Sequence, residues 1–525
     1  MFSRFRTLLL IVLLLMILTV LSSCIPLLKR IQVTITSTPL LDELTVGKRE
    51  RTLPYTFMVR KGEKIQVRAP LVPGYDFVGW LINNELDEAA NIEVSVEDAT
   101  LIKAVYAPKL VDERTIGGKG NEFGAGISLL DSSSLAVGIT TDSTNSALIL
   151  NNLGGADFWT SSISYDTGKF VVAPQKSYGG SSDEWLSSIA RITGGTISAG
   201  WTISEDIDFS GSGYPYRGGV DGYVFMLQDD GKLAWQTYIG GSGDDYIHSV
   251  SITVGERILL VGSTTSNDGN MKEIGYRAKK DGWVSLMSSY GTVITGFMKA
   301  FGGTDDDELL HGMQTRDGGY ILCGYSKSTD GDLANVNRSL GEDLWIIRLN
   351  HKLEIVWQRL MGGQKDERAH VVKEVDGGFI VAGYTTSTGR DITENKGGKD
   401  VWVLKFNYDG TLQWSRTLGG SKDEEAFDII QTADGGYALC GYTESADGDI
   451  RVNKGKRDLW VVKLGSDGFL EWEATFGGTD IDEGTRIVET AKRELLVIGT
   501  TYSNDRDVLS GLNGKSDAWL LRLGK

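Results

Sequence analysis

The chain has 525 residues, and its 70 acidic and 53 basic side chains give a formal net charge of −17. This excess of negative charge argues against nucleic acid or an acidic polymer as a general ligand, because either would be repelled. Only three cysteines occur. A disulfide framework is therefore not expected, and stability must come from a large hydrophobic core.

The first residues carry the pattern of an export signal. Two arginines precede the apolar residues 8–21, a stretch too short to cross a bilayer as a mature helix. It ends in Leu-Ser-Ser-Cys, which resembles a bacterial lipobox, whose cleavage leaves the cysteine as an acylated first residue; the alternative is an ordinary secretion signal with a chance cysteine. We expect a signal peptide over 1–23, lipidation at Cys24 and a tether over 24–30. Ile25 stands where an inner-membrane retention signal favours Asp, so we expect an extracytoplasmic anchor in the cell envelope, on the outer membrane if the cell has one.

Residues 31–108 have the pattern of a separate small β domain. Alternating segments such as IQVTIT and KIQVRA lead to the motif GYDFVGW, and a further segment closes in AVYA. The G-Y-x-F-x-G-W motif and the closing A-V-Y resemble the divergent internalin-type B-repeat. That resemblance implies a surface module of extracytoplasmic proteins and supplies no catalytic residues.

The rest of the chain is a sevenfold repeat. A Gly-Gly pair followed by acidic residues recurs at intervals of 62, 61, 62, 60, 57 and 58 residues. The seven pairs begin at Gly117, Gly179, Gly240, Gly302, Gly362, Gly419 and Gly477. So regular a period indicates one supersecondary unit per repeat, stacked because a single unit cannot bury its own apolar face.

Each repeat contains four short segments of β character. In the sixth repeat, EEAFDIIQT, YALCGYTES, DLWVVKL and FLEWEATF are separated by turns, two of which are Asp-Gly turns suited to tight hairpins. No segment carries helical spacing over more than two turns. Four antiparallel strands in each of seven repeats predict an all-β fold, a seven-bladed β-propeller over residues 109–525.

The two ends of the repeat region complement each other. The last repeat stops after its third strand, whereas residues 110–116 form a strand with no blade before it. We therefore predict that residues 110–116 supply the outer strand of blade seven. Such pairing closes the ring, so that the last blade has no missing outer strand and no unpaired sheet edge in its place.

These motifs carry a resemblance to a known family. In the sixth repeat they read WSRTLGG, DGGYALCGYTES and GKRDLWVVKL, and this pattern resembles the bacterial seven-bladed β-propeller repeat. The likeness covers residues 110–525 and implies the fold. It implies no particular activity, because fold does not determine function.

Acidic residues recur at two positions of each repeat. The first is the fifth residue after the leading glycine, which is Glu122 in the first repeat, and these acids are expected on one face of the ring. Six of them form a candidate ligand face: Glu184, Asp245, Asp307, Glu367, Glu424 and Asp482. The second position precedes the third strand and is expected to be structural: Asp157, Asp221, Asp281, Asp343, Asp400, Asp458 and Asp517. The competing interpretation of the first set is also structural, with each acid binding backbone N–H groups near the Gly-Gly turn.

A cation is the one cofactor that the sequence indicates. Asp447 and Asp449 with Asn453, and likewise Asp330 and Asp332, offer hard oxygen ligands on single loops, as Ca²⁺ prefers. Neither loop has the closing Glu of the twelve-residue EF-hand pattern. Calcium and a purely structural role both remain open at this point.

Two tryptophans depart from the repeat pattern. Most tryptophans recur at fixed positions of the blades, as expected for packing between blades, but Trp185 and Trp201 both lie in the second repeat outside those positions. Near the acidic face they are candidates for stacking on a sugar ring. Partial burial is the alternative.

Three functional hypotheses follow. The first is a lipid-anchored extracytoplasmic binding or scaffold protein, a monomer that presents its acidic face to a protein or glycan of the envelope and contacts the membrane only through its lipid. The second is an envelope polysaccharide hydrolase or lyase that uses carboxylates on that face. The third is an envelope spacer. Catalysis needs one site distinct from its copies, so seven similar repeats favour a protein that is not an enzyme.

Overall fold

A computed structural model of the full chain describes residues 30–524, apart from 39–42, 47, 48, 73, 84, 88, 145, 151, 166, 167, 208–215 and 337–340. The chain divides into two compact units, Met1–Ala107 and Pro108–Lys525. The expected signal peptide and Cys24 lie outside the described residues. Within the described part, no helix is long and apolar enough to span a membrane.

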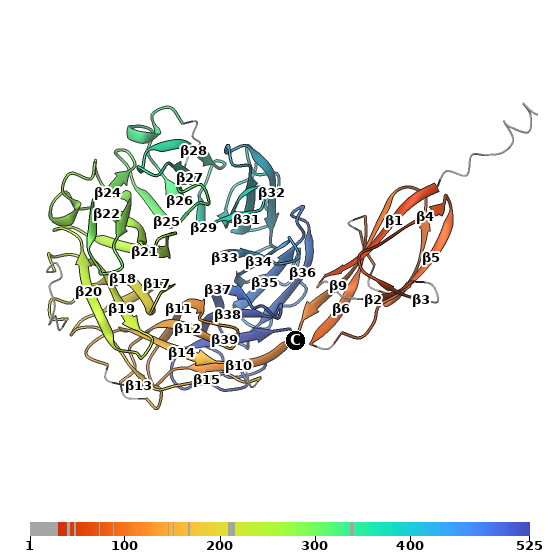
Figure 1. Cartoon of the computed structure of the whole chain (residues 1–525), viewed down its shortest axis with the longest axis horizontal. Helices are drawn as coiled ribbons and strands as arrows, with labels where there is room; N and C mark the ends of the chain where they lie inside the picture. The colour runs from red at the N-terminus through yellow and green to blue at the C-terminus, as the bar shows by residue number, and fades with distance from the viewer. Residues whose placement is uncertain are drawn as a thin grey trace, which may run out of the picture. The chain divides into compact units, whose positions relative to one another are not determined.

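The first unit consists of two β-sheets (Figure 1). One sheet has the order β4 (Tyr55–Arg60), β1 (Arg30–Thr38), β9 (Thr100–Pro108), β6 (Tyr75–Ile82) and β7 (Glu85–Asp87). The other has the order β3 (Arg49–Thr52), β2 (Glu43–Val46), β5 (Glu63–Arg68) and β8 (Asn91–Val96). In β8, buried and exposed residues alternate strictly, as in a strand with one face on a core.

The aromatic residues of the GYDFVGW motif form the core of this unit. Trp80 is fully buried, and Phe77 packs edge-on against it with ring centroids 5.6 Å apart. Tyr106, from the closing AVYA segment, contacts Phe77 from the other side at 5.3 Å. The two motifs noted in the sequence thus meet in one hydrophobic cluster.

The second unit is a seven-bladed β-propeller, which confirms the predicted fold. Its described residues form seven four-stranded antiparallel sheets arranged around a common axis (Figure 1). From the axis outward, blade 1 consists of β11 (Glu122–Leu129), β12 (Ser134–Thr141), β14 (Asp157–Ser164) and β15 (Val171–Val172). Blade 2 consists of β17 (Glu184–Ile192), β18 (Gly195–Thr202), β19 (Asp221–Gln228) and β20 (Leu233–Ile239). Blade 3 consists of β21 (Asp245–Ile252), β22 (Ile258–Thr264), β23 (Asp281–Met287) and β24 (Val293–Phe301). Short segments add a β13–β16 pair (Ile149–Leu150, Gln175–Lys176) and the 3-10 helices η1 (Gly269–Met271) and η2 (Gly331–Leu333).

Blades 4 to 7 repeat the same order. They are β25 (Asp307–Gln314), β26 (Tyr320–Ser326), β27 (Asp343–Leu349), β28 (Ile355–Met361); β29 (Glu367–Val375), β30 (Gly378–Thr385), β31 (Asp400–Phe406), β32 (Leu412–Leu418); β33 (Glu424–Gln431), β34 (Tyr437–Thr443), β35 (Asp458–Leu464), β36 (Leu470–Phe476); and β37 (Asp482–Glu489), β38 (Leu495–Thr501), β39 (Asp517–Leu523), β10 (Leu110–Ile116). In every blade, the inner strand and the third strand both begin at an acidic residue that recurs in each repeat.

The last blade closes the ring as predicted. Strand β10 pairs antiparallel with β39, with Thr115 opposite Trp519. Ile116 at the end of β10 is fully buried in a cluster that joins blades 7 and 1 and includes Ile127 and Leu520. A strand from the start of the unit is therefore the outer strand of its last sheet.

This closure predicts how substitutions in β10 affect stability. Ile116→Asp places an uncompensated carboxylate in the core between blades 7 and 1, and we expect it to reduce the free energy of unfolding by about 3–5 kcal/mol. Val111→Asp introduces the same group at a position of the same strand that is 44% exposed, so it should change stability by less than ~0.5 kcal/mol. Chemical denaturation measures both. Equal losses would contradict the proposed role of Ile116.

Candidate functional site

Each Gly-Gly loop leads from the outer strand of one blade to the inner strand of the next, and a buried carboxylate organises it. In blade 6, Glu424 accepts hydrogen bonds from the N–H of Gly420 and from the hydroxyl of Thr443, both at 2.8 Å. Thr443 ends the second strand of the same blade. The other six acids accept bonds from the same two kinds of donor.

The expected ligand face is not formed by these acids. All of them are 0% exposed, which corrects the assignment of Glu184, Asp245, Asp307, Glu367, Glu424 and Asp482 to a ligand-binding surface. The physical reason is the Gly-Gly turn, whose free N–H groups need an acceptor inside the loop. These carboxylates supply it, so none is available to a partner in solution.

A second buried carboxyl group lies against each of the first. In the junction between blades 3 and 4, a Cβ atom added to Gly302 would lie 2.3 Å from Asp281 Oδ1 and 2.6 Å from Asp307 Oδ2. The two carboxyl oxygens therefore approach the same point, and the leading glycine is required because they occupy the space of a side chain. Asp281 comes from the third strand of blade 3 and Asp307 from the inner strand of blade 4, so the pair joins two blades.

Most of these pairs contain a carboxyl oxygen that has no hydrogen-bond donor in the described part of the chain. Among the described residues, Oδ1 of six of the third-strand aspartates is buried and has no hydrogen-bond donor: Asp157, Asp221, Asp281, Asp400, Asp458 and Asp517. Two ionised carboxylates are both acceptors, so only a proton on one of them makes a bond between them. Burial, reinforced by the neighbouring carboxylate, raises the pKa of Asp221 and Asp281 to about 7 and that of Asp400 and Asp458 to about 6.

The raised pKa values predict a pH dependence. The folded state holds these protons more tightly than the unfolded chain does, so the stability they contribute is complete below about pH 4 and is lost as the pH rises through about 6 to 7. Between about pH 4 and about pH 6 to 7, we expect the free energy of unfolding to fall by up to ~1.4 kcal/mol per pH unit for each pair. Denaturant titrations at a series of pH values measure this slope.

Asp281→Asn tests a single pair. Its amide supplies a permanent donor toward Asp307, while its oxygen can keep the bond from the N–H of Arg277. We expect a shallower pH slope than that of the unaltered protein, and a higher stability at about pH 8. Glu273→Gln is the matched control, an exposed residue of the same blade. Identical slopes for the two variants would exclude a shared proton at this junction.

The candidate calcium loops have other partners. Asp447 Oδ1 accepts a bond from the N–H of Ser421 at 2.8 Å, whereas Asp449 pairs with Lys396. Asn453 donates its side-chain amide to a strand carbonyl at 3.3 Å. Each group thus serves a different neighbour, and the three do not converge on one point for a cation.

The same arrangement occurs in blade 4. Asp330 accepts bonds from the N–H and hydroxyl of Thr304, both at 2.8 Å, and Asp332 pairs with Arg277 at 2.9 Å. Within the described part of the chain, no three His, Cys, Asp or Glu side chains are grouped so that they could hold a metal ion. In the structure these aspartates fasten neighbouring loops together, and calcium binding at these loops stays a prediction.

The structure brings the two unusual tryptophans into one aromatic surface. Trp185 and Trp201 are paired across β17 and β18, and their rings are nearly parallel at 9° with centroids 6.3 Å apart. Phe123 of blade 1 packs on Trp185 at 4.8 Å, and Tyr246 of blade 3 packs edge-on against Trp201 at 5.9 Å. We call these four residues the aromatic ledge. Trp185 is 37% exposed and the other three are half-buried.

The ledge occupies only part of the ring. Phe123, Trp185 and Tyr246 each follow the buried acid of an inner strand, and in blades 4 to 7 this position holds Glu308, Arg368, Glu425 and Glu483. Those four side chains are neutralised by ion pairs with Lys280, Glu342, Lys399 and Arg457. The position after the buried acid is thus aromatic in blades 1 to 3 and charged in blades 4 to 7.

The axis of the propeller is lined by one residue or more from every inner strand. A cavity of about 260 Å³ there includes His311, Lys373, Asp428 and Arg486. Lys373 and Asp428 lie 3.6 Å apart, and Asp428 also accepts a bond from the N–H of Ile487. Burial lowers the pKa of His311 well below its ordinary value, which favours the neutral imidazole. Arg486 donates to the backbone carbonyls of Thr485 and Ser187, whereas His311 Nδ1 has no hydrogen-bond partner among the described residues.

Comparison with solved structures finds several β-propellers at low similarity. Sqt1 from Chaetomium thermophilum has a TM-score of 0.33 and 11% identity over 60% of this chain and 66% of its own. The Pseudomonas aeruginosa periplasmic gluconolactonase has a TM-score of 0.38 and 11% identity, over 70% of this chain and 88% of its own. BBS1N in complex with ARL6DN has a TM-score of 0.35 and 9% identity, over 78% of this chain and 94% of its own. Known sequence families and curated proteins give no match. The fold assignment accordingly rests on the sheets described above.

Proposed function

We propose that this protein is a lipid-anchored, extracytoplasmic binding protein that holds a glycan of the cell envelope on the aromatic ledge of its propeller. The observation that carries the proposal is the ledge itself. Four aromatic side chains lie side by side, and three of them, Phe123, Trp185 and Tyr246, stand where blades 4 to 7 place ion-paired residues. Trp185 packs on Phe123 of blade 1 and still leaves 37% of its surface exposed.

The chemistry of the ledge suits a sugar. One face of a pyranose ring presents C–H groups, which pack favourably on the electron-rich face of an aromatic ring, while its hydroxyl groups stay in contact with polar neighbours. Trp185 and Trp201 are nearly parallel with ring centroids 6.3 Å apart, and Trp185, which is 37% exposed, offers a sugar ring an accessible aromatic surface. On the side of blade 3, His248 stacks on Tyr246 and lies 3.4 Å from Glu308, which places polar groups at the end of the ledge.

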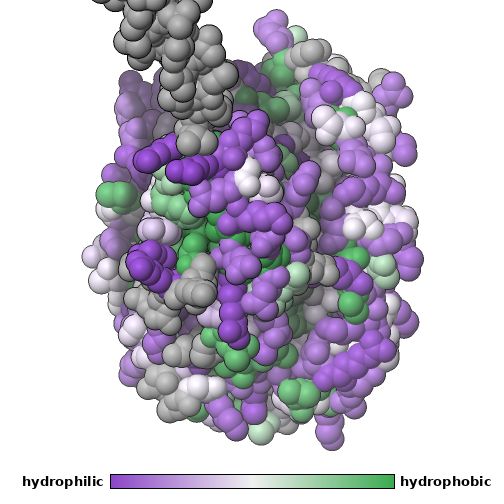
Figure 2. All heavy atoms as spheres, turned by 90° about the vertical axis from the view of Figure 1, so that its right-hand side faces the viewer, coloured by the Kyte–Doolittle hydropathy of each residue, from purple (hydrophilic) through white to green (hydrophobic). Residues whose placement is uncertain are grey.

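The other hypotheses have less support. A hydrolase or lyase needs two accessible carboxyl groups in different environments, but the repeated acids are enclosed and alike in every junction. A protein partner would favour a larger continuous apolar surface than four aromatic rings. Figure 2 shows one side of the molecule, on which hydrophilic side chains predominate and hydrophobic ones lie between them.

We expect Trp185→Ala to weaken glycan binding about tenfold, because one aromatic contact of this kind contributes about 1–1.5 kcal/mol. Tryptophan fluorescence or calorimetry with purified envelope polysaccharide fragments measures the effect. Tyr290→Ala is the matched control, since Tyr290 is an aromatic residue that is 84% exposed and lies in the β23–β24 turn. If no neutral or acidic fragment bound the unaltered protein, or if both variants bound equally well, the ledge would not be the binding site.

Anchoring through Cys24 is the second part of the proposal. The lipobox-like Leu-Ser-Ser-Cys after an apolar segment supports it. We expect Cys24→Ser to abolish incorporation of labelled fatty acid and to release the protein from the membrane fraction. The outcome that contradicts the proposal is an unchanged membrane fraction with no fatty acid on either protein.

A further inference from the structure

The junction between blades 7 and 1 lacks an interaction that other junctions share. In four of them, a carboxylate six residues after the end of the second strand accepts a bond from the N–H of the leading glycine. The pairs are Gly302–Asp332 at 3.2 Å, Gly362–Asp391 at 3.1 Å, Gly419–Asp449 at 3.0 Å and Gly477–Asp507 at 3.1 Å. A fifth glycine, Gly240, donates to Asn270 at 3.2 Å.

A cation usually accompanies this carboxylate. Arg277, Lys396 and Lys454 each lie four residues before the recurring aspartate of the third strand, and they pair with Asp332, Asp449 and Asp507 respectively. The junction therefore contains its own bound carboxylate, held by one backbone N–H and one cationic side chain. Such charge-assisted bonds are among the stronger hydrogen bonds in proteins.

Both partners are replaced where the ring closes. Ala147 stands at the position of the carboxylate, six residues after Thr141, and Asn513 stands at the position of the cation. Asn513 turns its amide toward Asp517 at 2.7 Å. Gly117 is buried, and its N–H has no acceptor in the described part of the chain. The absence of the internal carboxylate thus leaves an unpaired backbone donor.

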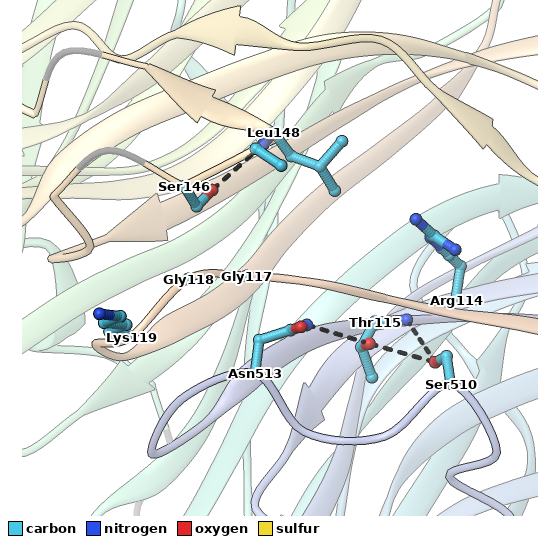
Figure 3. A pocket seen from close by; sticks show the side chains of 10 residues that line it. Arg114, Thr115, Gly117, Gly118, Lys119, Ser146, Leu148, Ser510 and Asn513 are labelled. Carbon is cyan, nitrogen blue, oxygen red and sulfur yellow. Dashed lines mark hydrogen bonds between the residues drawn. The ribbon is translucent and has the colours of Figure 1, made fainter.

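A cavity of about 380 Å³ occupies this place (Figure 3). Figure 3 shows Arg114 and Lys119 at its two ends with Gly117 between them, and neither cation has a carboxylate partner among the described residues. Ser146 accepts bonds from two backbone N–H groups, at 3.2 and 2.8 Å, which leaves its own hydroxyl proton available. The lining contains no acidic side chain.

We propose that this cavity, the closure pocket, binds the carboxylate group of a small acidic sugar, with the uronates as its substrate class. The sugar carboxylate takes the position that Asp449 and Asp507 fill in other junctions and accepts the N–H of Gly117. Arg114 and Lys119 neutralise its charge, as Lys396 and Lys454 do for the internal carboxylates. The inference does not depend on the aromatic ledge.

Size and charge restrict the ligand. A volume of about 380 Å³ lies at the lower end of ligand-binding cavities and suits a monosaccharide unit. A protein of net charge −17 repels a long polyanion, but a single carboxylate is compensated locally by two cations. A planar carboxylate is also the group that the equivalent position holds elsewhere in the ring, so a tetrahedral phosphate is the less suitable anion.

Calorimetry on the full chain tests the pocket with sodium glucuronate, glucose and inorganic phosphate as separate probes. We expect saturable glucuronate binding that is at least ~10-fold tighter than binding of the other two, because glucose lacks the charge and phosphate lacks the planar shape. Equal binding of glucose, tighter binding of phosphate, or no glucuronate binding at millimolar concentration would overturn the proposal.

Ala147→Asp supplies the missing carboxylate from the chain itself. We expect it to weaken glucuronate binding at least ~10-fold while leaving the melting temperature unchanged or higher. Ala334→Asp is the matched control, because it adds the same charge at an exposed loop position of blade 4. Lys119→Ala, at an exposed position, provides a second variant that does not disturb packing and should also weaken binding. Unchanged affinity in both Ala147→Asp and Lys119→Ala would place the ligand elsewhere. If these variants lose glucuronate binding while the glycan binding that depends on Trp185 stays normal, the closure pocket and the aromatic ledge are separate sites, and each proposal is tested independently of the other.

Discussion

A carboxylate enclosed at the start of each inner strand is the interaction on which the propeller depends. It accepts bonds from its own Gly-Gly loop and from the second strand of its own blade, and it lies against the aspartate of the third strand of the preceding blade. Three strands from two blades are therefore fixed at one point. The same requirement exists at every junction, which explains why the acid, the hydroxyl residue and the leading glycine all repeat.

This constraint also decides where recognition can occur. Side chains that every blade needs for its junction are enclosed and unavailable to a partner. Positions at which one blade differs from the rest are free to vary, and both proposed binding regions arise there. Three residues of the aromatic ledge stand in blades 1 to 3 where blades 4 to 7 have ion-paired residues, and the closure pocket lies where Ala147 and Asn513 replace an internal ion pair.

Much of the architecture could be predicted from the sequence, because a period near 60 residues with four β segments determines the topology almost alone. The closing strand could be found because one repeat was short by the strand that another segment supplied. The place of the acids in the junction could also be predicted, but not their burial, since polar residues on turns are usually exposed and nothing local indicates enclosure by a neighbouring blade. For the same reason, the separate partners of the aspartates in the Asp-Gly-Asp loops could not be predicted.

The proposed binding surface could be predicted only in part from the sequence. Trp185 and Trp201 depart from the pattern of the repeat tryptophans, whereas nothing in the tryptophan pattern indicates Phe123 and Tyr246. An alignment of the seven residues that follow the buried acid would have shown both, since the first three are aromatic and the last four are charged. The closure pocket is harder to predict, because its signal is an alanine where other repeats have an acid, and an absent group becomes meaningful only beside its unpaired glycine N–H.

The closing strand has a consequence for how the chain reaches its native state. Thr115 and Ser510 are hydrogen-bonded although 395 residues separate them, and β10 has no partner strand until β39 has been synthesised. Six blades can form from local hairpins while the first strand of the unit remains an open edge. Contacts of such long sequence separation are slow to form and expose unpaired strands to aggregation in the meantime. Ring closure is therefore expected to be a late folding event, and the step at which assembly is most vulnerable to mispairing with other chains.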